Sequence, residues 1–130
     1  MKKTDKKAKK QRILIVEDEA NYAKLLKSQL VERGFLVDIA ENGLEAMKLT
    51  REKKPCLVVL DIIMPKMDGY QYLEKLRADE ELDEIQVLVL SNLGTDKKKD
   101  LIKKWKILDF ILKTEISLVE TLNMIEKICR

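Results

Sequence analysis

The sequence predicts a single α/β domain in which a parallel sheet is covered by helices on both faces. A chain of 130 residues is the right size for one domain with one hydrophobic core, and 45% of its residues are hydrophobic. Short apolar runs, many of them β-branched, alternate along the chain with amphipathic stretches. Strands that are buried on both faces of a parallel sheet show such continuous apolar runs, and the alternation with helices predicts right-handed crossovers.

The first two strand–helix units follow from local patterns. Residues 13–16 form a compact β-branched run that predicts a buried strand, and residues 35–40 predict a second strand. Between them, apolar side chains recur along one face of a helix that ends at Gly34: Tyr22, Leu25, Leu26 and Leu30. Asn42-Gly43 is a turn signal that opens the next helix, and Pro55 ends that segment.

The remaining units repeat this alternation. Strands are expected at residues 57–60, 87–90 and 107–112. Helices are expected at about 70–77, at about 96–105 and from near Glu115, the last one carrying Leu118, Val119, Leu122, Ile125 and Ile128. The acidic stretch 79–84 predicts a solvated loop. There is no internal repeat after residue 13, so the domain is expected to span residues 13–130.

Charge is distributed unevenly along the chain. Residues 1–12 hold seven basic side chains and one acidic side chain, so the remaining 118 residues carry a net charge of −3 although the whole chain carries +3. We expect residues 1–12 to be a disordered, solubilising tail. The alternative is that the tail contacts an acidic partner, a nucleic acid or a membrane surface. For the chain as a whole we expect no direct binding to nucleic acid and no association with a membrane.

Several functional classes are disfavoured by composition. No apolar run follows the basic start, as a secretory signal would require, and no stretch approaches the ~18 apolar residues of a membrane span. The two cysteines, Cys56 and Cys129, match no metal or redox spacing, and we expect reduced packing residues in a cytoplasmic protein. The chain has no histidine, so any chemistry must use carboxylates, hydroxyls and lysines.

Polar residues follow four of the five predicted strands: Glu17 and Asp18, Asp61, Ser91, and Lys113. Ligands of such sheets bind at the carboxyl ends of the strands, so these side chains are expected to converge. Neighbouring carboxylates repel one another and favour a hard cation between them, for which Mg²⁺ is the default. A carboxylate nucleophile, a metal, a hydroxyl donor and an ammonium group are the parts that phosphoryl transfer needs.

Each of these residues also has an ordinary structural interpretation. Asp18 alone would be a helix N-cap, Ser91 a loop hydroxyl, and Lys113 one of 26 basic residues. Their occurrence together, in order, at the ends of predicted strands favours the functional interpretation.

These residues resemble the receiver domains of two-component response regulators, including the chemotaxis-regulator-like members. The resemblance covers about residues 12–128, and its most specific part is the segment 61–69, which matches the family signature D-x-x-M-P-x-M-D-G. It implies a flavodoxin-like (βα)5 three-layer sandwich with a five-stranded parallel sheet in the order 2-1-3-4-5. It also implies a signalling module that accepts and slowly hydrolyses its own phosphoryl group and is not a turnover enzyme.

The resemblance also assigns roles to individual residues. Asp61 would be the phosphoacceptor, and the Mg²⁺ ligands would be Asp18, Glu17 (through water), Asp61 and the backbone carbonyl of Ile63. Ser91 would bond to a phosphoryl oxygen, and Lys113 would pair with the phosphoryl group. Phe110 would be the aromatic switch residue that turns inward when the Ser91 hydroxyl moves.

Partners follow from the same resemblance. The phosphoryl donor would be a phosphohistidine on a sensor histidine kinase or phosphotransfer protein. The face formed by the fourth helix, fifth strand and fifth helix (α4-β5-α5 in the family) would switch to bind an unknown downstream protein, with phosphorylation-dependent homodimerisation as a further expectation. The predicted elements leave no output domain, whether the chain is a single-domain regulator or a fragment.

The sequence departs from the family pattern at three places. Thr114 replaces a proline that often has a cis bond, and Asn92 replaces a small residue. Lys106-Ile107, preceded by Trp105, replaces the usual Gly-Ala before the fifth strand. For Trp105, packing over the fifth strand and a partner-specific surface formed with the lysines of 97–106 remain open.

Two other functions were weighed against the phosphorylation switch. A receiver-like protein-interaction scaffold that no longer switches would explain Thr114, Asn92 and Trp105, but not the intact acidic pair, Asp61, Ser91 and Lys113. An aspartate-based phosphatase or transferase would need a substrate pocket and a cap, for which 130 residues leave no room. Nucleotide-binding glycine motifs are not present.

Overall fold

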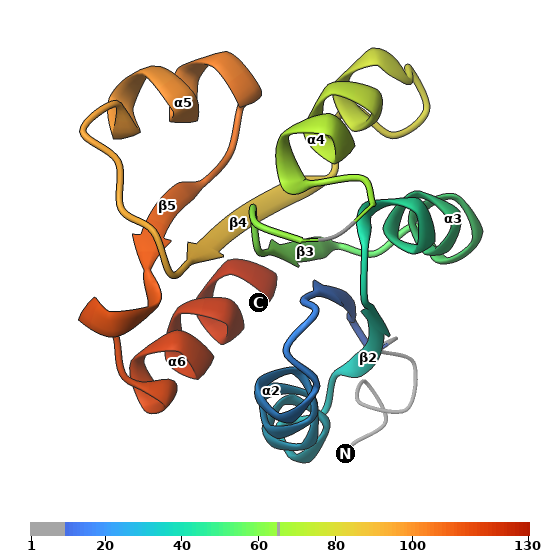
Figure 1. Ribbon diagram of the computed structural model, residues 1–130. Coiled ribbons are helices and arrows are strands. Elements are labelled where there is room, and N and C mark those ends of the chain that lie inside the picture. Colours follow the sequence, from blue (N-terminus) through green and yellow to red (C-terminus); the bar gives the residue numbers. More distant parts are fainter. Residues whose placement is uncertain (1–9, 65) are drawn as a thin grey trace.

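The computed structural model describes residues 10–64 and 66–130. Five parallel strands form one sheet in the order β2-β1-β3-β4-β5, which confirms the predicted flavodoxin-like topology (Figure 1). The strands are β1 (Arg12–Val16), β2 (Leu36–Ala40), β3 (Leu57–Leu60), β4 (Gln86–Ser91) and β5 (Asp109–Leu112). The register pairs Val16 with Leu60 and Ser91 with Leu112, so the carboxyl ends of four neighbouring strands lie along one edge.

Helices cover both faces of this sheet and make three layers (Figure 1). They are α2 (Ala20–Glu32), α3 (Gly43–Lys53), α4 (Gly69–Ala78), α5 (Lys98–Trp105) and α6 (Leu118–Cys129). Alternate residues of β1 point to opposite faces: Ile13 and Ile15 pack with α2 and α6, whereas Leu14 and Val16 pack with α3 and α4. The central sheet therefore contributes to two hydrophobic cores at once.

The fifth strand and last helix begin later than predicted. Residues 107 and 108 precede β5: Lys106 adopts a left-handed conformation (φ 55°), and the amide of Leu108 donates to the carbonyl of Val87. Ile107 is nevertheless buried. Lys113–Glu115 forms a 3-10 helix, η1, and α6 begins at Leu118 because the capping box of Ser117 and Glu120 sets its first turn.

Three expectations about side-chain placement are wrong in detail. Leu25 and Val119, expected on the apolar faces of the first and last helices, are 47% and 59% exposed. The acidic segment 79–84 is a turn, but it includes Leu82, whose side chain is buried in the core.

Most of the predicted tail, residues 1–9, lies outside the described residues, so its disorder stays a prediction. Arg12 is the first residue of β1, and its guanidinium contacts the Asp38 carboxylate of β2 at 2.7 Å. Among the described residues, no helix combines the length and apolar character needed to cross a bilayer.

Candidate functional site

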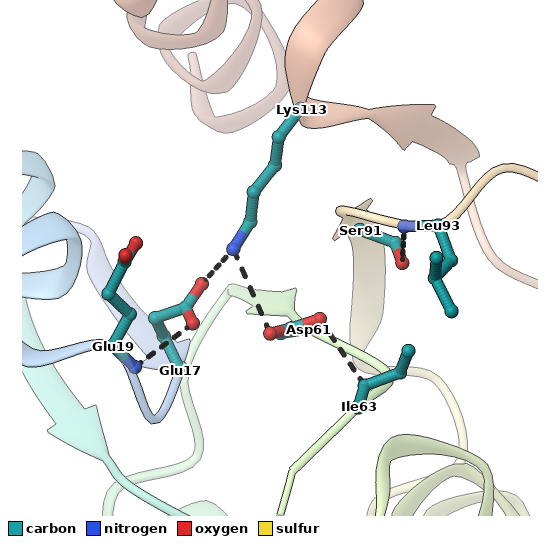
Figure 2. Close-up of polar contacts among 7 residues, drawn as sticks. All are labelled: Glu17, Glu19, Asp61, Ile63, Ser91, Leu93 and Lys113. Carbon is teal, nitrogen blue, oxygen red and sulfur yellow. Dashed lines mark hydrogen bonds and ion pairs between the residues drawn. The ribbon is translucent and has the colours of Figure 1, made fainter.

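Four of the predicted site residues converge at the carboxyl edge of the sheet: Glu17, Asp61, Ser91 and Lys113 (Figure 2). Glu17 and Asp61 directly follow β1 and β3, which are paired, and the amide of Asp61 donates to the carbonyl of Val16 at 2.9 Å. Ser91 is the last residue of β4, and Lys113 directly follows β5. The topology thus brings together residues that are up to 96 positions apart in the sequence.

Three carboxylates form an acidic cluster at this edge. Glu17, Asp18 and Asp61 each place an oxygen so that the three atoms lie within 4.8 Å of one another. Glu17 and Asp61 are buried, at 4% and 5% exposure, whereas Asp18 is exposed. Asp18 is not the helix N-cap, because Glu19 occupies that position without a side-chain capping bond. Asp18 is therefore available as a ligand on the solvent side of the cluster.

The Lys113 side chain extends from the end of β5 toward Glu17 and Asp61 (Figure 2). Its ammonium group donates to a Glu17 carboxylate oxygen and lies 3.7 Å from Oδ2 of Asp61. The same group lies 4.7 Å from the ring centroid of Tyr22. One ammonium group thus faces two buried carboxylates, and the ring of Tyr22 adds a cation–π contact.

Tyr22 is a site residue that the sequence analysis did not identify. The helical spacing places Tyr22 on the apolar face of the first helix. It does not indicate a contact with Lys113, which is 91 residues away in the sequence. Burial raises the pKa of its hydroxyl, and the carboxylate of Glu17 raises it further. Tyr22 therefore remains protonated and holds its ring beside the ammonium group.

Burial also changes the ionisation of Glu17. It raises the pKa of Glu17 to about 7, although the hydrogen bond and positive charge of Lys113 act in the opposite direction. The nearby Asp61 carboxylate raises this pKa as well. Since three carboxylates lie beside the single ammonium group of Lys113, an additional cation would stabilise the cluster.

Ser91 and Asp61 are held by hydrogen bonds from the loops that follow their strands (Figure 2). The Ser91 hydroxyl oxygen accepts from the amide of Leu93 at 3.1 Å. Asp61 Oδ1 accepts from the amide of Ile63 at 3.3 Å, and the Ile63 side chain is 51% exposed. Ser91 and Glu17 lie on opposite sides of Asp61 in Figure 2, so Asp61 is the central member of the group.

Two further residues of the signature segment have structural roles. Asp68 is the N-cap of α4, and its side chain accepts from the amide of Gln71 at 2.9 Å. Gly69 lets the start of α4 approach the loop after Asp61, since a Cβ at this position would lie 2.6 Å from the Cα of Ile62. The signature segment therefore supplies the Asp61 carboxylate and also positions the loop that follows it.

The predicted switch residue, Phe110, lies on β5 opposite Val89 of β4. Its ring is 6% exposed and belongs to the core between the sheet and helices α3 to α5. Trp105 is half-buried against the same core, and Lys104 lies 5.0 Å from its ring centroid. The packing interpretation of Trp105 is thus supported by its contacts, and its partly exposed edge leaves room for a second role.

The donor set of the acidic cluster fits a hard divalent cation. All three side-chain ligands are carboxylates, and no cysteine belongs to the group. Oxygen-only ligands with one exposed member suit Mg²⁺, which keeps several of its waters and is held by one or two carboxylates.

Comparisons with known proteins match most of this chain to one family. The response regulator receiver domain family matches residues 13–126. The probable transcriptional regulator ycf29 of Porphyra purpurea is 42% identical over 87 residues, 67% of this chain and 42% of that protein. Response regulator Rre1 of Synechocystis sp. is 39% identical over 83 residues, 63% of this chain and 36% of that protein. The matched part is thus less than half of either relative.

A solved structure gives the same result for the fold. The non-phosphorylated HemR receiver domain from Leptospira biflexa superimposes with a TM-score of 0.82 at 28% identity, covering 92% of this chain and 94% of that one. An open parallel sheet with an acidic site at its carboxyl edge defines the class of this protein as an α/β domain of flavodoxin-like fold. The chain belongs to the response regulator receiver domain family. Members of this family are signalling modules of two-component systems, and they interact with histidine kinases or phosphotransfer proteins.

Proposed function

We propose that this chain is a Mg²⁺-dependent phosphorylation switch that accepts a phosphoryl group on Asp61. One observation carries the proposal: the buried Asp61 carboxylate lies beside both the acidic pair and Lys113, whose ammonium group is 3.7 Å away. This arrangement offers a nucleophilic oxygen, a positive charge for the incoming group and ligands for a cation in one place.

The reaction is an in-line displacement at phosphorus. An oxygen of the Asp61 carboxylate attacks the phosphoryl group of a phosphohistidine, an O–P bond forms, the N–P bond breaks, and the imidazole leaves. Lys113 is close enough to exchange part of its contact with Glu17 for a phosphoryl oxygen. A Mg²⁺ ion held by Asp18, Asp61, the Ile63 carbonyl and, through water, Glu17 would offset the negative charge of the phosphoryl oxygens.

Phosphorylation would then change the loop that follows β4. The Ser91 hydroxyl now accepts from the Leu93 amide, and donating to a phosphoryl oxygen would pull it toward Asp61. Ser91 is 1% exposed and is the last residue of β4, which pairs with β5. Its movement would therefore change the packing around Phe110 and the β5 face. The phosphoryl group thereby biases an equilibrium between two arrangements of the domain.

The output surface would be the α5-β5-α6 face, which corresponds to the α4-β5-α5 face in family numbering. It contains an open groove of about 350 Å³. Residues from all three elements line it, among them Lys98, Phe110, Leu112 and Met124. A groove that includes the switch residue supports binding of a downstream protein, or of a second copy of the chain, in a phosphorylation-dependent way.

The protein would act in the cytoplasm.

The scaffold alternative receives less support from the structure. Asn92 and Thr114, the two departures nearest the site, are both exposed. Neither takes part in the contacts among Glu17, Asp61 and Lys113. We infer that Asn92 affects how fast water reaches a phosphoryl group rather than whether Asp61 accepts one.

The test is intact-mass measurement after incubation with a small-molecule phosphodonor, with Mg²⁺ or with a chelator. We expect the wild-type protein to gain one phosphoryl group only with Mg²⁺, and Asp61→Asn to gain none. Asp96→Asn, at an exposed position, is the matched control and should behave as wild type. Absence of modification, together with no conformational response to beryllofluoride, would favour the scaffold instead.

A further inference from the structure

Two cysteines meet at the edge of the sheet opposite Asp61. Cys56 directly precedes β3, and Cys129 is the last residue of α6, 73 positions later. Their sulfur atoms lie 3.1 Å apart and share a hydrogen bond, and both thiols are free. Since β3 separates Cys56 from Asp61, the pair lies roughly 16 Å from the phosphoacceptor candidate at ~3.3 Å per residue. The two sites are therefore distinct.

The cysteine pair opens onto a pocket. An open cavity of about 450 Å³ is lined by both cysteines, by Ile128 of α6 and by the acidic side chains Glu81 and Glu84. Cys56 is half-buried, and Cys129 is 8% exposed. A small reagent in this pocket therefore meets the Cys56 sulfur more readily than the Cys129 sulfur.

We propose that Cys56 and Cys129 are a redox-modification site, which a small, uncharged peroxide converts reversibly into an intramolecular disulfide. Bond formation requires the sulfur atoms to approach by only about 1 Å, since an S–S bond is about 2.05 Å long. The acidic lining of the pocket disfavours anionic oxidants such as glutathione disulfide and leaves an uncharged peroxide as the fitting class of reagent.

The hydrogen bond between the thiols assigns a role to each sulfur. It lowers the pKa of Cys56, because the Cys129 thiol stabilises the Cys56 thiolate. The same bond, together with burial, raises the pKa of Cys129. Cys56 is accordingly the attacking thiolate, and Cys129 is the resolving thiol.

The chemistry balances without further groups. The Cys56 thiolate attacks one peroxide oxygen, the O–O bond breaks, and the leaving hydroxide takes up a proton, which leaves a sulfenic acid at Cys56. The Cys129 thiol then loses its proton and attacks the Cys56 sulfur; an S–S bond forms, the S–O bond breaks, and water leaves. Two thiols lose two electrons, and hydrogen peroxide is reduced to two molecules of water. Dithiol reductants reverse the change, as expected of a transient cytosolic disulfide.

The disulfide would fasten the end of α6 to the start of β3 and close a long loop of the chain. Cross-linking restricts the unfolded chain, so the oxidised protein should melt roughly 5–15 °C higher than the reduced protein. The effect is measurable because the partner elements are already in contact and need little rearrangement.

The experiment treats the full chain with hydrogen peroxide, alkylates the remaining thiols and maps the peptides by mass spectrometry. We expect the loss of two hydrogen atoms, no alkylation, a Cys56–Cys129 cross-linked peptide, full reversal by dithiothreitol, and slower reaction with glutathione disulfide. Thiols that stay alkylatable under conditions that oxidise an exposed cysteine peptide would overturn the proposal, as would disulfides between chains. Oxidation only to sulfinic or sulfonic acids would do the same. A faster reaction with glutathione disulfide would overturn the choice of oxidant.

Two variants separate the roles of the sulfurs. In Cys129→Ser, peroxide should leave a sulfenic acid at Cys56 that dimedone traps. In Cys56→Ser, the remaining Cys129 should react more than tenfold more slowly, since it is buried. Equal reactivity of the two single cysteines would contradict the assigned order. The wild-type peptide map decides whether the disulfide forms, even if a variant fails to fold.

Discussion

The main feature of the acidic cluster is that most of its charged side chains are buried. Glu17 and Asp61 are almost fully buried and lie beside the exposed Asp18, while Lys113 supplies a single positive charge. Natural domains tolerate such unbalanced charge at functional sites, at a cost in stability. The same excess of negative charge favours the binding of a cation at the acidic cluster.

Asp61→Asn should stabilise the domain in the absence of divalent cations. The substitution removes one of the clustered negative charges, and Glu17 retains its bond to Lys113, so we expect the free energy of unfolding to rise by about 1 kcal/mol. Urea unfolding in the presence of a chelator measures it, with Asp96→Asn as the neutral control. A fall in stability would mean that the Lys113–Asp61 contact outweighs the repulsion.

Tyr72 should make stability depend on pH in the alkaline range. Its side chain is fully buried and its hydroxyl donates to Thr50 Oγ1, which itself donates to the carbonyl of Ala46. Burial raises the pKa of Tyr72 to about 12, above the value of about 10 in the unfolded chain. The unfolded state therefore loses its proton first as pH rises.

The stabilisation by neutral Tyr72 is fully present below pH 10 and is lost between about pH 10 and 12. The free energy of unfolding should fall by about 1.4 kcal/mol per pH unit in this range, and urea unfolding at several pH values measures the fall. Tyr72→Phe has no proton to lose, so its stability should fall less steeply in the same window. Equal slopes for the two proteins would show that other groups account for the alkaline loss.

At the scale of elements, the close approach of α4 to the loop after β3 positions the phosphoacceptor candidate. The amide of Gly69 donates to the carbonyl of Ile62 at 2.8 Å, and the capping box of Asp68 and Gln71 sets the first turn of α4. A helix start that is fastened in this way limits the movement of the loop that carries Asp61.

Gly69→Ala should disturb this junction, whereas Gly94→Ala should not. A Cβ at Gly69 would lie 2.6 Å from the Ile62 Cα, but one at Gly94 would meet only Leu112 methyl groups at 3.9 Å. We expect Gly69→Ala to cost about 1–3 kcal/mol of stability and Gly94→Ala less than about 0.5 kcal/mol. Gly69→Ala should also slow phosphorylation of Asp61. Similar unfolding midpoints for the two variants would contradict the tight contact.

At the scale of the whole molecule, one sheet joins two hydrophobic cores. Successive residues of β1, β3 and β4 enter opposite cores, so neither helical layer can separate without exposing the strands that support the other. The domain is therefore expected to unfold as one cooperative unit.

Leu122→Ala tests this cooperativity across the sheet. Leu122 of α6 is 2% exposed, and its truncation should cost about 2–4 kcal/mol. Trp105, the single tryptophan, packs in the opposite core. If the cores are coupled, tryptophan fluorescence and far-ultraviolet circular dichroism will shift to the same lower urea midpoint. A fluorescence midpoint that stays in place would show that the layers unfold separately.

The fold class and a candidate group of site residues follow from local sequence patterns. Apolar runs such as 57–60 show their buried strands locally, and in a parallel sheet the residue after each strand must lie at one edge, so Glu17, Asp61, Ser91 and Lys113 could be grouped from their order alone. The boundaries were less predictable. Ile107 is apolar and buried like a strand residue, but the left-handed Lys106 delays the start of β5.

Only the tertiary structure decided which distant side chains meet. Tyr22 beside Lys113 and Cys56 beside Cys129 join elements whose separation leaves no local pattern. The raised pKa of Glu17 likewise depends on burial by residues far along the chain. Helical and strand periodicity records which face of an element is buried, whereas contacts between elements depend on how those faces pack, and packing is a property of the folded chain as a whole.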